Sequence, residues 1–141
     1  MTEPLHIIYT DGSAIGNGNP DAACGWAFLI LEEGMETASG SGGCIGSTNN
    51  RMEMTAAIMA MRACTDKSAP SVLYSDRQYV VRTVKGEFSI KKNHDLWHEL
   101  FSEKKKFSDI RFEWVRGHDK DAYNNCVDNM ARKAAEDAVT A

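Results

Sequence analysis

The sequence predicts an α/β fold with a mixed five-stranded sheet, three antiparallel strands then two parallel strands, flanked by helices. Three strand-like segments follow one another closely near the N-terminus, which is typical of an antiparallel meander. Two later strand-like segments are reached through helical segments, and strands joined in this way are normally parallel with right-handed crossovers. A length of 141 residues fits one hydrophobic core, so we expect residues 1–141 to form a single domain.

The first three strands are predicted at Leu5–Thr10, Gly25–Leu31 and Met35–Ile45. The first segment is rich in β-branched and aromatic residues, and we expect it to end in a turn at Asp11-Gly12-Ser13. Residues 16–20 are rich in Gly and Asn and predict a loop. The third segment alternates small and polar residues, as a half-exposed strand does.

Helical and strand-like segments alternate after this meander. A start signal at Asn49-Asn50 precedes strong helix formers. Apolar residues recur with a period of two at Ile110, Phe112 and Trp114, which predicts the last strand. In chain order, the expected segments are a helix at Arg51–Cys64, a strand at Val72–Ser75, helices at Arg77–Val84 and Asp95–Lys105, the strand at 110–114 and an Ala-rich helix at Val127–Ala138.

Composition excludes several classes of protein. With 43% hydrophobic and 26% charged residues, the chain is typical of a globular protein. It has no apolar run near the roughly 20 residues that cross a membrane, and the N-terminus lacks the basic and apolar regions of a signal peptide. We therefore expect a cytoplasmic protein without a membrane partner. The four cysteines form no Cys-x-x-Cys pair, so we expect reduced structural thiols and no zinc site.

The charge balance bears on nucleic-acid binding. A formal net charge of −4 argues against a protein that holds nucleic acid by bulk charge alone. It is compatible with an enzyme that combines local basic clusters with an acidic, metal-loaded centre. Such clusters occur at Lys91-Lys92 and Lys104-Lys105-Lys106, although runs of this kind are also common on solvated faces.

Four carboxylates stand at the predicted element ends. Asp11 and Asp76 follow the first and fourth strands, whereas Glu53 and Asp128 open the first and last helices. Each has an ordinary explanation: a turn for Asp11, a helix cap for Asp76, a capping box with Asn50 for Glu53, and an ion pair with Arg132 for Asp128. Taken singly, each explanation stays open.

The helix faces favour a shared site for these acids. Glu53 shares a face with Ala57 and Ala60, and Asp128 shares one with Ala131 and Ala135, so small residues would carry both acids close to the sheet. Converging buried acids repel one another unless they bind a cation. Carboxylates suit Mg²⁺, and two such ions about 4 Å apart can clamp the attacking and leaving oxygens of a phosphoryl displacement.

Five motifs in register resemble those of the type 1 ribonucleases H, and together they span nearly the whole chain. They are Tyr9–Ser13, Thr48–Ala57, Tyr74–Val80, Trp114–His118 and Cys126–Arg132. The resemblance implies an RNase H-like fold and an endonuclease that hydrolyses the RNA strand of an RNA/DNA hybrid, leaving 5′-phosphate and 3′-hydroxyl ends. It also implies two Mg²⁺ ions, with Mn²⁺ as a substitute, and we expect a monomer.

The resemblance also implies residue roles. Asp11, Glu53, Asp76 and Asp128 would be metal ligands, and His118 would move protons and help release the product. Among the substrate contacts, Asn17, Asn49 and Asn50 would read the minor groove and the 2′-hydroxyls, while Thr48 and Asn93 would cradle a phosphate of the DNA strand.

The sequence departs from the family pattern in a few places. The stretch from Asp76 to Asn93 is too short for the basic helical protrusion that many members carry, which marks a short form. Arg77 stands where a small hydroxyl residue is usual, Asn125 replaces a common Glu, and the residues after His118 lack the usual Gly.

Three alternatives stay open: a DNA-junction nuclease or transposase core on the same fold, a non-catalytic nucleic-acid-binding module, and a piece of a larger polymerase.

Overall fold

The computed structural model of this protein describes residues 5–116 and 122–140. Its elements follow the predicted order of three strands, a helix, a strand, two helices, a strand and a helix. They are β1 (His6–Ile15), β2 (Ala23–Glu32), β3 (Met35–Ile45), α1 (Asn49–Ala63), β4 (Ser71–Ser75), α2 (Gln78–Val84), α3 (His94–Lys104), β5 (Ile110–Trp114) and α4 (Ala122–Thr140). None of the helices in these two stretches has the length and apolar character to cross a membrane.

The five strands form one mixed sheet in the order β3-β2-β1-β4-β5. The pairs β1–β2 and β2–β3 are antiparallel, and the pairs β1–β4 and β4–β5 are parallel. The connection from β1 to β4 contains α1, and the connection from β4 to β5 contains α2 and α3. Parallel strands need such crossovers, because the chain must return to the edge of the sheet at which the previous strand began. The predicted fold class is therefore confirmed.

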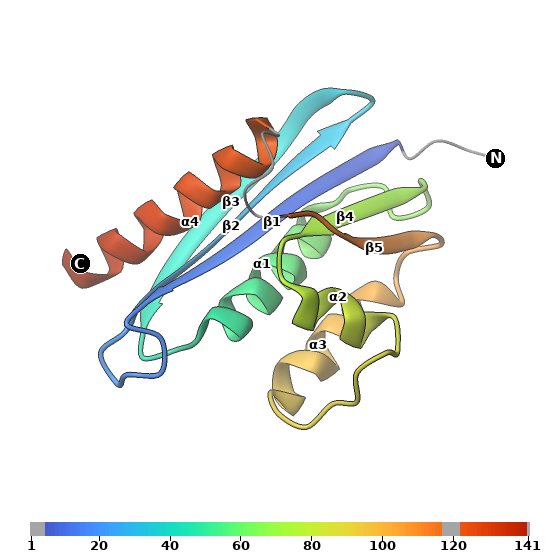
Figure 1. The fold of residues 1–141 in the computed structure, drawn as a ribbon. Helices are drawn as coiled ribbons and strands as arrows, with labels where there is room; N and C mark the ends of the chain where they lie inside the picture. Colours follow the sequence, from blue (N-terminus) through green and yellow to red (C-terminus); the bar gives the residue numbers. More distant parts are fainter. Residues whose placement is uncertain (1–4, 117–121, 141) are drawn as a thin grey trace.

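Helices cover both faces of the sheet (Figure 1). On one face, α1 contacts β1 and β2 and also packs against α2 and α3. A large apolar cluster fills this layer, centred on Ile8, Ile30, Met54, Leu73 and Trp97. On the other face, α4 lies across β1, β2 and β3 over a smaller cluster that includes Leu29, Val127 and Ala131.

The predicted end of the first strand is wrong. β1 does not turn at Asp11-Gly12-Ser13 but continues to Ile15, pairing with β2 as far as Ile15↔Ala23. Asp-Gly favours a turn locally, yet here long-range pairing prevails. Gly12 also suits this position because α1 crosses it closely, so that a Cβ atom would lie 2.6 Å from the carbonyl carbon of Met52.

The last helix begins earlier than predicted. α4 starts at Ala122 rather than Val127, so Asp128 lies in its second turn and does not open it. Neighbouring Asn124 and Asn125 are weak helix formers, which explains the late predicted start. Tertiary packing outweighs this preference because Asn124, Val127, Ala131 and Ala135 form one buried stripe against the sheet.

The cysteines are only partly as predicted. All four are free thiols, in agreement with the expected absence of structural disulfides. Cys24 and Cys64 are buried, as small apolar side chains usually are. Cys44 and Cys126 are exposed, so these two thiols have no place in the core.

Candidate active site

Three of the four predicted metal ligands meet at one edge of the parallel strands. Asp11, Glu53 and Asp76 each offer a carboxylate oxygen, and these oxygens lie within 4.8 Å of one another. The parallel pairing of β1 and β4 ends at Tyr9↔Tyr74, which places Asp11 and Asp76 at equivalent positions two residues further on. Open α/β sheets gather their sites beyond such carboxyl ends.

Glu53 reaches this cluster from α1, of which it is the fifth residue. Its side chain is only 1% exposed. The backbone N–H of Gly12 donates to Glu53 Oε1 at 3.0 Å and to Asp11 Oδ1 at 2.9 Å, so one amide holds both acids. Ser75 Oγ donates to Glu53 Oε2 at 3.4 Å. The capping-box explanation of Glu53 is wrong, because the cap of α1 is the Thr48 hydroxyl, which accepts from the N–H of Arg51.

The burial of these acids alters their protonation. Removal from water raises the pKa of Asp11 to about 8, with further increases from the charges of Asp76 and Asp128, against a lowering hydrogen bond from Glu53. Burial likewise raises the pKa of Glu53 well above its ordinary value, and the negative charges of Asp11 and Asp76 act in the same direction. A bound cation would offset both shifts, because it stabilises the charged carboxylates.

The donor set fits a hard divalent cation. Asp76 Oδ1 is buried and has no hydrogen-bond partner within the described part of the chain, whereas buried polar atoms are nearly always paired. Three mutually repelling carboxylates, one of which has an unpaired oxygen, form the kind of oxygen-rich site that Mg²⁺ or Mn²⁺ prefers. Trp114 Nε1, at the end of β5, donates to the backbone carbonyl of Asp76 at 3.2 Å and so helps to fix the backbone of this residue.

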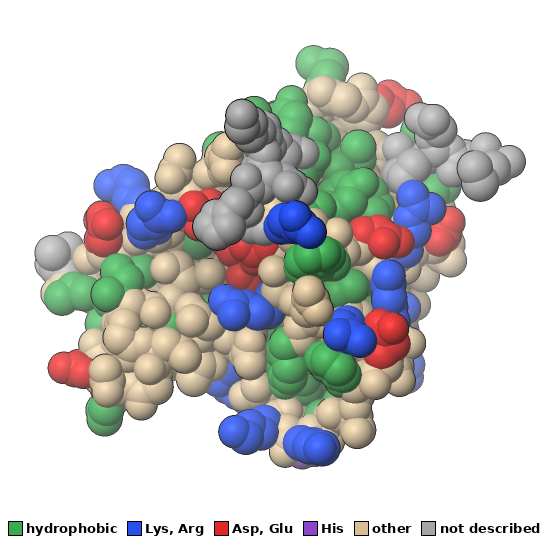
Figure 2. All heavy atoms as spheres, in the orientation of Figure 1, with side chains coloured by type: hydrophobic (Ala, Val, Ile, Leu, Met, Phe, Trp, Pro, Cys, Tyr) green, Lys and Arg blue, Asp and Glu red, His purple; other side chains and the backbone are tan. Residues whose placement is uncertain are grey.

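Asp128 stands apart from the other three acids. It is 43% exposed and pairs with Arg132 at 2.7 Å, which is the ordinary ion pair that its spacing allowed. The carboxylate nevertheless lies close enough to Asp11 to raise the pKa of that residue through a hydrogen bond and through charge. Asp128 thus borders the cluster on its solvent side. Figure 2 shows acidic side chains at the centre of this face, bordered by Lys and Arg.

The five predicted substrate-binding residues share one pocket. The pocket measures about 270 Å³. Its lining consists of Asn17, Thr48, Asn49, Asn50, Arg77, Lys92 and Asn93. The loop after β1 is tied to the start of α1, because Asn17 Oδ1 accepts from the N–H of Asn49 at 2.9 Å. Residues from four separate parts of the sequence therefore form a single polar surface beside the carboxylates.

Arg51 holds the far wall of this pocket in place. Its guanidinium donates to both carboxylate oxygens of Asp95, at 3.0 and 2.8 Å, and to Asn93 Oδ1 at 3.1 Å. Asn93 itself adopts the left-handed conformation, with φ 59°, and its Nδ2 donates to the hydroxyl of Tyr79 at 3.3 Å. Sequence reasoning did not assign Arg51, Ser75 or Trp114, although all three lie inside or beside the quoted motifs.

His118 lies outside the described residues, so its predicted role in proton transfer stays a prediction.

Comparisons with known proteins agree with this geometry. The family model described as RNase H matches residues 3–136. The chain is a member of the ribonuclease H family. The family comprises divalent-metal-dependent endoribonucleases, so the chain is a ribonuclease H enzyme.

Two bacterial relatives extend over almost the entire chain. The ribonuclease H of Chromobacterium violaceum is 35% identical, covering 96% of this chain and 97% of its own. That of Lachnoclostridium phytofermentans is 38% identical, covering 92% and 90%.

Solved structures share the fold. An N-terminal RNase H domain from Mycobacterium tuberculosis, solved as a fusion with maltose-binding protein, superposes with a TM-score of 0.83 at 22% identity, covering 98% of each chain. A ribonuclease H1 solved in complex with an RNA/DNA hybrid superposes with a TM-score of 0.81 at 23% identity, covering 95% of this chain and 99% of its own.

Proposed function

We propose that this ribonuclease H hydrolyses the RNA strand of RNA/DNA hybrids and leaves 5′-phosphate and 3′-hydroxyl ends. The observation that carries this proposal is the cluster of Asp11, Glu53 and Asp76, whose carboxylate oxygens lie within 4.8 Å of one another. Beside it lies a pocket lined by amides and cations, with no acid among its lining residues. A binding module would need the pocket but not buried, mutually repelling acids.

Asp11, Glu53 and Asp76, with Asp128 at the rim, would hold two Mg²⁺ ions, for which Mn²⁺ can substitute. When bound, such ions activate water and offset the negative charge of the transferring phosphoryl group. Gly12 and Ser75 keep two of the ligands oriented through hydrogen bonds to Asp11 and Glu53. In the reaction, a water oxygen bonds to phosphorus, the bond from phosphorus to the 3′ oxygen breaks, and His118 serves the accompanying proton transfers.

The pocket would select the hybrid. Asn17, Asn49 and Asn50 offer amide donors and acceptors that suit the 2′-hydroxyls and base edges of a minor groove. Thr48 and Asn93 would bind a phosphate of the DNA strand. Asn93 is suited to this task because Arg51 and Tyr79 fix its side chain from two sides. The hybrid-bound ribonuclease H1 of the same fold supports this choice of substrate.

Cleavage of end-labelled nucleic acids tests the proposal directly. An RNA/DNA hybrid should be cut in its RNA strand in Mg²⁺, while single-stranded RNA, duplex RNA and duplex DNA stay intact. The Asp11→Asn protein controls for contaminating nuclease. Preferred cutting of a four-way DNA junction would indicate a junction nuclease, and tight hybrid binding without turnover in Mg²⁺ or Mn²⁺ would indicate a binding module.

Three further expectations complete the proposal: residues 1–141 form a single catalytic domain, the protein works as a monomer, and it is located in the cytoplasm. Gel filtration with light scattering, with and without a short hybrid, measures the oligomeric state. A mass twice that of one chain would contradict the expected monomer.

A further inference from the structure

Arg77 directly follows Asp76, and its side chain lines the pocket described above. It occupies the N-cap position of α2 with an extended backbone, φ −104° and ψ 106°, but its side chain forms no capping hydrogen bond. Its Nε atom is buried and has no hydrogen-bond partner in the described structure. Over the same residues, Arg77 forms no ion pair, whereas Arg51 and Arg82 pair with Asp95 and Glu87. Burying a charged donor without a partner costs free energy, so the geometry calls for an anionic partner.

The partner would lie in the pocket of about 270 Å³ that Arg77 lines together with Thr48 and Asn93. Lys92 supplies a second cation to the same pocket, and it too has no ion pair within the described residues. The other lining residues are neutral amides and a hydroxyl, and no Asp or Glu lines the pocket. Two unpaired cations among neutral hydrogen-bonding groups form a site for a phosphate-like anion.

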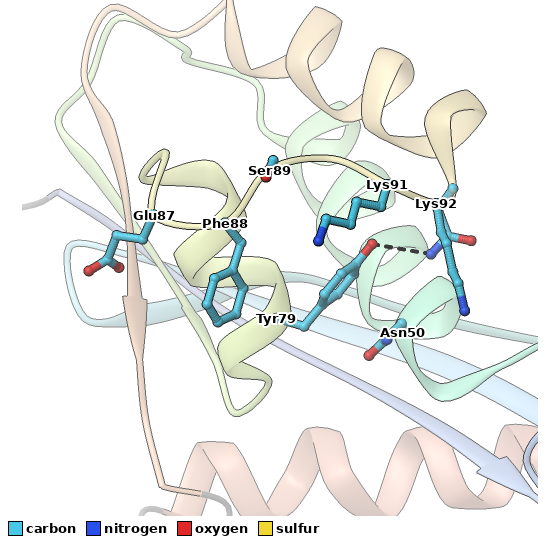
Figure 3. Close-up of a pocket in the computed structure, with 8 residues that line it drawn as sticks. Asn50, Tyr79, Glu87, Phe88, Ser89, Lys91 and Lys92 are labelled. Atoms are coloured by element: carbon cyan, nitrogen blue, oxygen red, sulfur yellow. Dashed lines mark hydrogen bonds between the residues drawn. The ribbon is translucent and has the colours of Figure 1, made fainter.

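The adjoining surface extends this positive region. A second pocket, of about 480 Å³, shares Asn50, Lys92 and Asn93 with the first and adds Lys91. Figure 3 shows Lys91 and Lys92 on the segment before α3, with the side chain of Lys91 pointing toward the ring of Tyr79. Glu87 also lines this second pocket, but it pairs with Arg82 at 3.8 Å and forms no ion pair with Lys91 or Lys92 among the described residues.

We infer that Arg77, assisted by Lys92, binds a backbone phosphodiester of the DNA strand in this pocket, as a further substrate-binding residue. The inference rests on the proposed function, which places a DNA phosphate at Thr48 and Asn93. A guanidinium matches the geometry of a phosphate better than an ammonium does. With a net charge of −4, the protein needs local cations to hold a polyanion, and the short segment between Asp76 and Asn93 leaves no room for a basic protrusion.

Binding of a labelled hybrid by Arg77→Ser, compared across a series of salt concentrations, tests this inference. All proteins carry Asp11→Asn, so that binding is measured by fluorescence anisotropy without turnover. Loss of one charged phosphate contact should weaken binding about 10-fold and lower the slope of log K against log salt by about 1. Arg77→Lys keeps the positive charge, so it should keep the wild-type salt slope but recover only part of the affinity that Arg77→Ser loses. This partial recovery would show that the loss in Arg77→Ser does not come from misfolding.

Arg82→Ser is the matched control, because it makes the same substitution within α2, five residues further on and outside the pocket, where Arg82 pairs with Glu87. It should leave affinity and salt slope nearly unchanged. If folded Arg77→Ser behaves like Arg82→Ser, while the wild-type enzyme cleaves the hybrid, the inference is wrong and the proposed function stands. Failure of the wild-type enzyme to cleave would instead count against the proposed function.

Neutral methylphosphonate linkages identify the strand that Arg77 binds. One linkage at a time is replaced in the DNA strand or in the RNA strand. At one DNA position, the replacement should weaken binding about 10-fold when Arg77 is present. In the Arg77→Ser protein the same replacement should cause no further loss of affinity, so that the two effects are not additive. The same non-additivity at an RNA position would overturn the assignment to DNA, as would its absence from both strands.

Discussion

Asp11 is placed where its proposed role in metal binding lowers the stability of the metal-free fold. Its side chain is 3% exposed, and this burial, together with the negative charges of Asp76 and Asp128, raises its pKa to about 8. The single amide of Gly12 does not offset this repulsion. The sequence predicted the role of Asp11 as an acid at the site but not its position within a continuous strand, because the Asp-Gly pair is locally typical of a turn.

Replacing this carboxylate should separate activity from stability. We expect Asp11→Asn to abolish turnover, because a metal ligand is lost. We also expect the variant to raise the free energy of unfolding of the metal-free protein by about 1–3 kcal/mol at pH 8, because a buried charge is removed. Urea denaturation in EDTA measures the second effect. Glu36→Gln, an exposed acid on β3, is the control and should change neither quantity; a destabilised Asp11→Asn protein would contradict the argument.

At the scale of single elements, the contact between β1 and α1 sets the geometry of the site. Gly12 allows the backbones of Met52 and Glu53 to approach β1. This approach brings the Glu53 carboxylate to the Gly12 amide at 3.0 Å. Sequence reasoning identified both residues within motifs, but it could not predict how closely the two backbones meet.

A methyl group at this contact should therefore be costly. We expect Gly12→Ala to lower the free energy of unfolding by about 2–4 kcal/mol, because the helix must move away from the strand. Gly34→Ala is a useful comparison. Gly34 has a positive φ of 83° but no atom near its would-be Cβ, so only backbone strain of about 1 kcal/mol is expected there. Equal losses in chemical denaturation would show that the close approach is unimportant.

The pairing of α1 with the start of α3 is a second contact between elements that bears on function. Arg51 holds both Asp95 and Asn93, and its guanidinium lowers the pKa of Asp95 to about 2. Without the carboxylate, Arg51 loses one partner and Asn93 loses part of its support. The pocket would then be less well ordered before substrate binds.

Asp95→Asn should therefore affect substrate binding more than chemistry. We expect KM for the hybrid to rise about 3- to 10-fold with kcat nearly unchanged, as for a lost ground-state contact. Asp66→Asn, an exposed acid that hydrogen-bonds Ser68, is the matched control. Steady-state kinetics on a short hybrid measure both constants, and a selective fall in kcat would place Asp95 closer to the reaction than we argue.

At the scale of the whole molecule, global stability should depend on pH through the acidic cluster. The folded-state pKa of Asp11 is raised, so the unfolded chain releases this proton at lower pH than the folded chain does. Stability of the metal-free protein should then fall as pH rises from about 4 towards 8. Acids with a lowered pKa, such as Asp95, have the opposite effect, but they are already ionised in both states above about pH 5.5.

Divalent metal should reverse this trend. Thermal melts at pH 5.5 and pH 8 should show a lower Tm at pH 8 in EDTA. Mg²⁺ should raise the Tm more at pH 8, because binding requires the charged carboxylates. The Asp11→Asn protein should show a weaker pH dependence in EDTA. A Tm that rises with pH in the metal-free wild-type protein would contradict the assigned pKa direction.

The sequence by itself determined the element order, the mixed five-stranded sheet and the residues of the acidic and substrate motifs. These follow from local periodicity and motif spacing, which do not depend on distant contacts. Tertiary structure alone decided that β1 runs through Asp11, that α4 begins before Asp128, and that Asn17, Thr48 and Asn93 share a pocket with Arg77 and Lys92. Pairing and packing between segments distant in sequence outweigh local preference, so these features could be read only from the folded chain.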